Sequence, residues 1–157
     1  HGQQRCALRL CAVRRVRFDT GIFECSVYPG FEKSLKALKA AGKRLFVATS
    51  KPEVYARRIM EHFDLDQYFE YVAGMELDGG RGSKAEVIGY LIDTCRMQDK
   101  KRILMIGDRE HDVLGAKQEG LDCMGVLYGF GNREELEKAG AVYVAGTPED
   151  IAGIILK

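Results

Sequence analysis

The chain has 157 residues, of which 46% are hydrophobic and 30% are charged, a composition typical of one globular domain with its own core. No apolar run approaches the roughly 20 residues of a membrane-spanning helix, so we expect no membrane association. The formal net charge is +1. Residues 1–17 contain five Arg and no acidic residue, which leaves 19 basic against 23 acidic side chains in residues 18–157. This balance argues against a nucleic-acid-binding surface on the body of the protein.

Cysteine usage indicates a reducing compartment. The five cysteines form no CxxC pair and have no histidine at metal-ligand spacing, so we expect no zinc site. They are Cys6, Cys11, Cys25, Cys95 and Cys123. We therefore expect free thiols and a cytoplasmic location.

The start of the chain is the part that the sequence explains least. Residues 6–13 are apolar enough for a strand, but the spacing of the arginines would also suit a helix, and both alternatives stay open. The arginines also interrupt the apolar stretch that a secretory signal needs. Because the first methionine is Met60, we expect a fragment, a processed product or an expression product. We treat residues 1–25 as an N-terminal segment and residues 26–157 as the main domain.

Helical and strand-like patterns alternate from residue 28 onward. The pattern predicts a turn at 28–30, a helix over 31–41, a strand over 45–48, a helix over 52–63 and a strand over 71–73. A glycine-rich loop follows, and then a helix begins near residue 83. This βα alternation favours a parallel sheet with helices on both faces.

The strand over 45–48 delivers three polar residues to its carboxyl end. Thr49, Ser50 and Lys51 lie there, directly before the next helix. Hydroxyl groups, a lysine and the amides of a helix N-terminus together suit a phosphate group. The alternative interpretation is that Thr49 or Ser50 only caps the helix.

A lysine stands at the start of the next helix. Ser83 is the expected N-cap, and Glu86 would close a capping box with it. Lys84 follows in the first turn, where the positive end of the helix dipole repels it. Such a lysine is tolerated where an anion faces it or where the side chain extends into water, and the sequence leaves both open.

Two acidic residues follow the most apolar strand of the chain. The pattern predicts a buried strand over 103–106, and Asp108 comes directly after it. Asp112 follows one helical turn later, so the two carboxylates can share one side of the turn and suit a hard cation such as Mg²⁺. The alternative is a structural one, in which Asp108 caps the helix and Asp112 faces its dipole.

The remaining elements complete the same pattern. We expect a strand over 123–127, a short helix over 133–139, a strand over 142–144 and a terminal helix over 148–156. Residues 129–131, GFG, lack the third glycine of a dinucleotide-binding fingerprint, so a nucleotide cofactor is not expected.

Together these motifs resemble the haloacid dehalogenase superfamily of phosphohydrolases. Thr49, Lys84 and residues 107–112, GDREHD, match in order and spacing the phosphate-binding Thr, the neutralising Lys and the GDxxxD motif of that family. Residues 28–30, 50–52 and 112–116 are similar to its phosphoglycolate phosphatase branch, and residues 74–79 together with 107–112 are similar to its 5′-nucleotidase-like members. The resemblance covers about residues 20–157.

This resemblance implies a three-layer α/β/α Rossmann-like core with a mostly parallel sheet. It implies a Mg²⁺-dependent phosphatase that acts on a small phosphate monoester such as phosphoglycolate or a nucleoside monophosphate. Lys84 and Thr49 would serve catalysis, Thr49, Ser50, Lys51 and Lys84 would bind phosphate, and Asp108 and Asp112 would hold the metal. Residues 1–25 would be a cap-domain remnant or non-native sequence.

The family's first motif, a DxD on the first strand, is absent, and with it the aspartate nucleophile. Residues 63–66, FDLD, have similar letters but come after Thr49, and Asp19 precedes Thr49 without a second Asp. We therefore expect the first strand and most of the cap to be missing and the chain to be inactive. The alternative is a non-catalytic phosphate-binding or protein-interaction module. A receiver-like domain is not expected, because its carboxylates would come before its Thr and Lys.

The missing strand would leave a gap in the sheet. In the family that strand lies between the strand ending at Thr49 and the strand ending at Asp108. Residues 6–13 are the only upstream segment apolar enough to fill the gap, although Arg9 would then have to avoid burial. We expect either that this segment pairs there or that unpaired strand edges make the chain prone to self-association.

Overall fold

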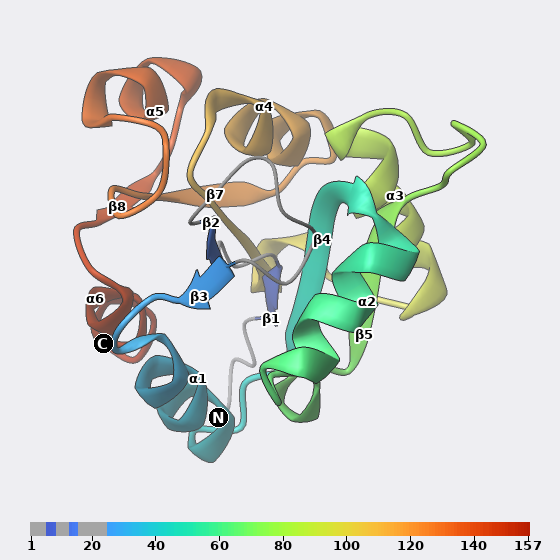
Figure 1. The fold of residues 1–157 in the computed structure, drawn as a ribbon. Coiled ribbons are helices and arrows are strands. Elements are labelled where there is room, and N and C mark those ends of the chain that lie inside the picture. The colour runs from blue at the N-terminus through green and yellow to red at the C-terminus, as the bar shows by residue number, and fades with distance from the viewer. Residues whose placement is uncertain (1–5, 9–12, 16–24) are drawn as a thin grey trace.

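The computed structural model describes the backbone of residues 6–8, 13–15 and 25–157, and the side chains from residue 26 onward. Strands and helices alternate along most of this part of the chain (Figure 1). The strands are β1 (Cys6–Leu8), β2 (Val13–Arg15), β3 (Cys25–Val27), β4 (Leu45–Pro52), β5 (Tyr71–Met75), β6 (Ile103–Gly107), β7 (Asp122–Val126) and β8 (Tyr143–Ala145). The α-helices are α1 (Phe31–Ala40), α2 (Glu53–His62), α3 (Lys84–Thr94), α4 (Glu110–Gln118), α5 (Arg133–Ala139) and α6 (Pro148–Ile155). Two short 3₁₀ helices are η1 (Asp66–Tyr68) and η2 (Lys100–Arg102).

The main sheet has the strand order β5-β4-β1-β6-β7-β8, and all its neighbouring strands are parallel. Helices α1, α2 and α6 supply apolar side chains to the core on one face, and α3, α4 and α5 supply them on the other. The predicted three-layer α/β/α core with a parallel sheet is therefore confirmed. Strands β2 and β3 form a separate antiparallel ribbon. Among the described residues, no helix is long and apolar enough to cross a lipid bilayer.

Strand β1 occupies the gap that the sequence predicts in the sheet. Ala7 pairs with Leu45 of β4 and with Leu104 of β6, so the backbone of β1 bonds to both inner edges. Pairing satisfies the N–H and C=O groups that the inner edges would otherwise leave unpaired. The expectation that an upstream segment fills this position is confirmed for residues 6–8. Arg9, whose burial was the difficulty, lies outside the described residues.

The boundaries of two neighbouring strands differ from the predicted ones. Strand β4 continues past Ala48 to Pro52, because an irregularity in its register lets Pro52 pair with Met75 of β5. Thr49, Ser50 and Lys51 are therefore the last part of a strand instead of a loop that follows one. The sequence predicts Pro52 as the first residue of α2, but in the structure Pro52 is the N-cap of this helix. The last two strands, β7 and β8, are each shifted by one residue from their predicted ranges.

Candidate active site

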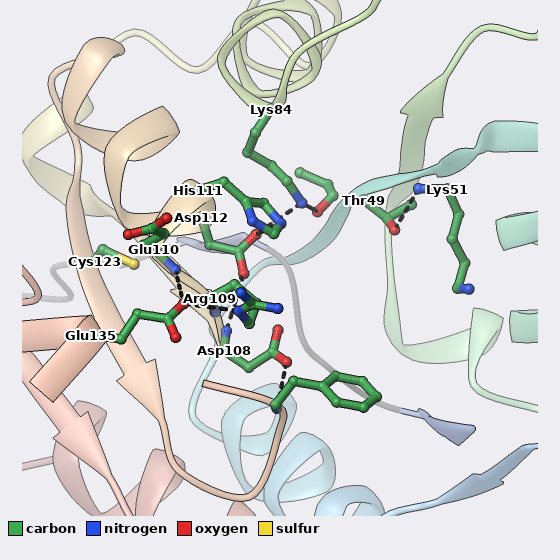
Figure 2. A network of polar contacts seen from close by, with 12 residues as sticks. Thr49, Lys51, Lys84, Asp108, Arg109, Glu110, His111, Asp112, Cys123 and Glu135 are labelled. Atoms are coloured by element: carbon green, nitrogen blue, oxygen red, sulfur yellow. Dashed lines mark hydrogen bonds and ion pairs between the residues drawn. The ribbon is translucent and has the colours of Figure 1, made fainter. Parts of the chain in front are cut away.

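Parallel strands bring the carboxyl ends of β4 and β6 to the same edge of the sheet, with β1 between them. Helices α3 and α4 begin at this edge, and they contact each other closely. Ligands of open α/β sheets bind at such an edge. Figure 2 shows that Thr49, Lys84, Asp108 and Asp112 come together here, as the sequence predicts.

The centre of the site is a buried ion pair between Lys84 and Asp112. Lys84 Nζ lies 2.9 Å from Asp112 Oδ1, and the two side chains are 3% and 0% exposed. Lys84 Nζ also donates a long hydrogen bond of 3.5 Å to the carbonyl oxygen of Ala48 in β4. Of the two possibilities that the sequence leaves for Lys84, an opposing anion is the one that the structure has. A paired lysine can be buried where an unpaired one could not.

The local sequence makes room for this lysine. Ser83 caps α3 by accepting the N–H of Glu86, as predicted. The capping box is not closed, because the Glu86 carboxylate accepts the N–H of Gly82 instead of that of Ser83. Gly115 on α4 faces the lysine stem, and a Cβ there would lie 2.8 Å from Lys84 Cγ. The close approach of α3 and α4 around Lys84 thus requires glycine at this position.

Asp112 has a structural role in addition to its pairing with Lys84. It is the third residue of α4, and its Oδ2 accepts the N–H groups of Asp108 at 3.1 Å and Arg109 at 3.2 Å. Arg109 is the N-cap of this helix, so the interpretation of Asp108 as a helix cap is wrong. A guanidinium has no acceptor, and Asp112 supplies the capping carboxylate from within the helix. Asp112 therefore orients the turn that carries Asp108.

Asp108 is 1% exposed and lies directly beyond β6. Its Oδ2 accepts the N–H of Phe130 at 2.9 Å, and its backbone oxygen accepts the N–H of Gly131 at 2.9 Å. These contacts tie Asp108 to residues 127–131, the loop between β7 and α5. In the sequence, the two glycines of this loop indicate only an incomplete cofactor fingerprint.

The three predicted phosphate-binding residues of β4 differ in their surroundings. Thr49 is 8% exposed, and its hydroxyl oxygen accepts the N–H of Lys51 at 3.2 Å, so it caps no helix. Ser50 is half-buried and Lys51 is exposed. In Figure 2 the Lys51 side chain lies beyond Thr49 as seen from Lys84 and runs away from the ion pair. Thr49 and Lys84 therefore belong to the centre of the site, and Lys51 lies at its margin.

A clamp between α4 and α5, which the sequence does not predict, is part of the site. Glu135 Oε1 accepts hydrogen bonds from Arg109 Nε at 2.8 Å and from the N–H of Glu110 at 2.9 Å. The Arg109 guanidinium lowers the pKa of the Glu135 carboxyl, and the carboxylate in turn raises the pKa of Arg109. The pair spans residues 26 positions apart, so no local sequence signal could have found it.

The donor set suits weak binding of Mg²⁺. Across residues 26–157, where side chains are described, no group of three or more His, Cys, Asp or Glu residues could together hold a metal ion. Mg²⁺ is commonly held by one or two carboxylates together with water and substrate phosphate oxygens. Asp108 fits such a role, whereas Asp112 is engaged by Lys84 and by two backbone N–H groups.

The rejected nucleophile candidates are also placed by the structure. Asp64 and Asp66 are exposed and lie between α2 and β5, at the amino end of β5 and thus at the edge opposite the site. This position separates residues 63–66 from Lys84 and Asp108. Asp19 lies outside the described residues.

Comparisons with known proteins agree on one family. The sequence model described as haloacid dehalogenase-like hydrolase matches residues 12–126. A 5′-nucleotidase of Pseudomonas aeruginosa is 48% identical over 123 residues, which cover 78% of this chain and 55% of that protein. The tyrosine-protein kinase PtkA of Mycobacterium tuberculosis is 42% identical over 119 residues, which cover 76% of this chain and 40% of the kinase.

Comparison with solved structures indicates the same family. The crystal structure of a predicted phosphatase from Clostridium acetobutylicum has a TM-score of 0.85 and 43% sequence identity, and the match covers 88% of this chain and 63% of that one. Phosphoglycolate phosphatases are among the sequence relatives as well. The chain spans about half the length of the curated relatives that it matches.

Proposed function

Because the chain belongs to the haloacid dehalogenase-like hydrolase family, we propose that it is the phosphate- and Mg²⁺-binding part of a phosphatase. The resemblance read from its motifs is confirmed at the level of the family, which includes 5′-nucleotidases and phosphoglycolate phosphatases among the relatives. The substrate would be a small phosphate monoester, either phosphoglycolate or a nucleoside monophosphate. The names of the relatives support these two classes.

The observation that carries this proposal is the buried Lys84–Asp112 pair next to the strand-end carboxylate of Asp108. A phosphate monoester dianion needs positive charge to offset it and fixed donors to orient it. Lys84 supplies the charge from a position that its neighbours fix, and the Thr49 hydroxyl can donate to a phosphate oxygen. Asp108 would hold Mg²⁺, which, when bound, neutralises phosphate charge and orients the ester. Asp112 keeps both Lys84 and Asp108 in place.

Hydrolysis in this family passes through an aspartyl phosphate, and no residue suited to that step lies among the described residues of the site. Lys84 and Thr49 can position and neutralise the ester, whereas the Asp108 carboxylate would be engaged by the metal. None of these three is suited to in-line attack on phosphorus. We propose that the chain itself is inactive as a phosphatase and that it binds its ligand without turnover.

A non-catalytic phosphate-binding or protein-interaction module is the alternative, and the lack of a nucleophile among the described site residues favours it. The edges of the main sheet are β5 and β8, and self-association would use one of them. We also propose a cytoplasmic location, which the pattern of cysteines supports.

Metal binding tests the proposal directly. We expect isothermal titration of the chain with MgCl₂ to show weak binding that is lost in Asp108→Ala. Asp122→Ala, which removes an exposed carboxylate at the start of β7, is the matched control and should bind like the unaltered chain. Tight binding that Asp108→Ala does not change would overturn the assignment of Asp108. If Asp108 holds Mg²⁺ as proposed, inorganic phosphate should bind more tightly with Mg²⁺ present than without it.

A further inference from the structure

The loop of residues 127–131, between β7 and α5, is built around Asp108. Two hydrogen bonds of 2.9 Å join it to this residue, one from the N–H of Phe130 to Oδ2 and one from the N–H of Gly131 to the backbone oxygen. Both donors are backbone N–H groups of the loop, so the bonds fix the position of the Phe130 backbone whatever its side chain does. The loop and the candidate metal ligand therefore form one unit.

Close packing fixes the loop further. A Cβ added at Gly129 would overlap the side chain of Asp108, and one added at Gly131 would overlap its backbone oxygen. Residues with side chains are thus excluded on both sides of Phe130. The GFG sequence, which is unexplained by a cofactor fingerprint, is explained by the approach of this loop to Asp108.

Phe130 is itself exposed. Its relative exposure is 67%, while the neighbouring Gly131 is buried and Gly129 half-buried. Exposed aromatic surface is unfavourable in water by roughly 25 cal/mol for each Å² of apolar area. A rigid loop that presents an aromatic ring has already lost the backbone freedom that binding would otherwise restrict. Such a ring suits the binding of a flat apolar group.

The backbone of Phe130 is bonded directly to Asp108, one of the residues of the candidate site. A continuous chain of contacts leads from Lys84 Nζ to Asp112 Oδ1, from Asp112 Oδ2 to the N–H of Asp108, and from Asp108 Oδ2 to the N–H of Phe130. Only two carboxylates therefore separate the lysine that would neutralise the phosphate from the residue that carries the ring. A phosphate monoester bound between Lys84 and Asp108 would extend its organic group toward solvent, and the side chain of Phe130, whose N–H is bonded to Asp108, is exposed to solvent as well.

We propose that Phe130 is a specificity-determining residue of this site, and that its ring stacks on a flat aromatic group of the phosphate monoester, such as a nucleobase. This inference rests on the proposed binding of phosphate monoesters and selects the nucleoside monophosphate over phosphoglycolate. Stacking suits the geometry because the ring is presented by a rigid backbone and is not covered by other described side chains. A base stacked on an aromatic side chain gains on the order of tenfold in affinity.

A pair of ligands that differ only in the base tests the inference. Adenosine 5′-monophosphate and ribose 5-phosphate are titrated by calorimetry into the chain in the presence of Mg²⁺. We expect the nucleotide to bind on the order of tenfold more tightly than ribose 5-phosphate. Phe130→Ala should abolish this difference and leave the affinity for ribose 5-phosphate unchanged, because the two backbone bonds to Asp108 remain. Phe130→Tyr should retain the difference.

Val142→Ala is the matched control. Val142 is also an exposed hydrophobic residue, but it precedes the amino end of β8, whereas the site lies at the carboxyl ends of the strands. This variant should bind both ligands like the unaltered chain. Equal affinities of the unaltered chain for the two ligands would refute the role of Phe130 alone, as would an equal loss for both ligands in Phe130→Ala. No binding of ribose 5-phosphate to the unaltered chain would refute the proposed function, and the inference with it.

Discussion

Replacing Lys84 by Met should destabilise the chain strongly, because it leaves the Asp112 carboxylate buried without its cation. Asp112 is fully buried and its Oδ1 faces Lys84 Nζ at 2.9 Å. Removing one partner of a buried ion pair costs about 3–5 kcal/mol. The Asp112 Oδ2 atom still accepts two backbone N–H groups, so we expect the lower end, about 3 kcal/mol. For a domain of this size that loss lowers Tm by roughly 6–12 °C.

The assay is urea unfolding followed by circular dichroism, with Lys33→Met as the control. Lys33 is an exposed lysine on α1, and its replacement should change the free energy of unfolding by less than about 0.5 kcal/mol. The double variant Lys84→Met/Asp112→Asn should lose less than the sum of the two single variants, since neither substituted position then carries an unpaired buried charge. The reasoning fails if Lys84→Met behaves like Lys33→Met, or if the effects of the two site substitutions simply add.

Three further predictions concern catalysis and pH. Hydrolysis of para-nitrophenyl phosphate by the chain should stay at background, and substantial Mg²⁺-dependent turnover that Asp19→Asn abolishes would show that Asp19 is the nucleophile. The pKa of Glu135 is lowered by Arg109, so its contribution to stability is present above the unfolded pKa and is lost as pH falls through the folded pKa. Glu135→Gln should therefore be less stable than the unaltered chain at neutral pH, and acid titration of stability should bring the two together. The hydrogen bond to Glu32 raises the pKa of Tyr68 in the folded chain to about 12. The contribution of this bond to the free energy of unfolding is therefore complete below the unfolded pKa of tyrosine and is lost as pH rises through the folded pKa. Ultraviolet titration should show a tyrosine that ionises near pH 12 and that Tyr68→Phe removes, and the same ionisation in Tyr68→Phe as in the unaltered chain would contradict the assignment.

Several parts of the site could be predicted because they depend on residues that are close in sequence. Asp108 and Asp112 are separated by one helical turn, so their mutual contact follows from local geometry. Strand ends of a parallel sheet share one edge, so the meeting of Thr49 with Asp108 follows from the βα alternation. The resemblance to the family likewise implies that a further strand must occupy the position between β4 and β6.

Other parts depend on contacts that sequence spacing does not encode. From its position in the sequence, Lys84 could face water or an anion. Only the packing of α3 against α4 at Gly115 determines that Lys84 pairs with Asp112. The bond between Glu135 and Arg109 and the closure of residues 127–131 over Asp108 likewise join elements that meet only when β6 and β7 pair. The hydrophobic pattern of the sequence predicts that these strands form, because strand formation here depends on which residues are buried. The partner of each polar group is decided by the tertiary structure, because a buried charge or N–H group must find whichever partner folding brings within reach.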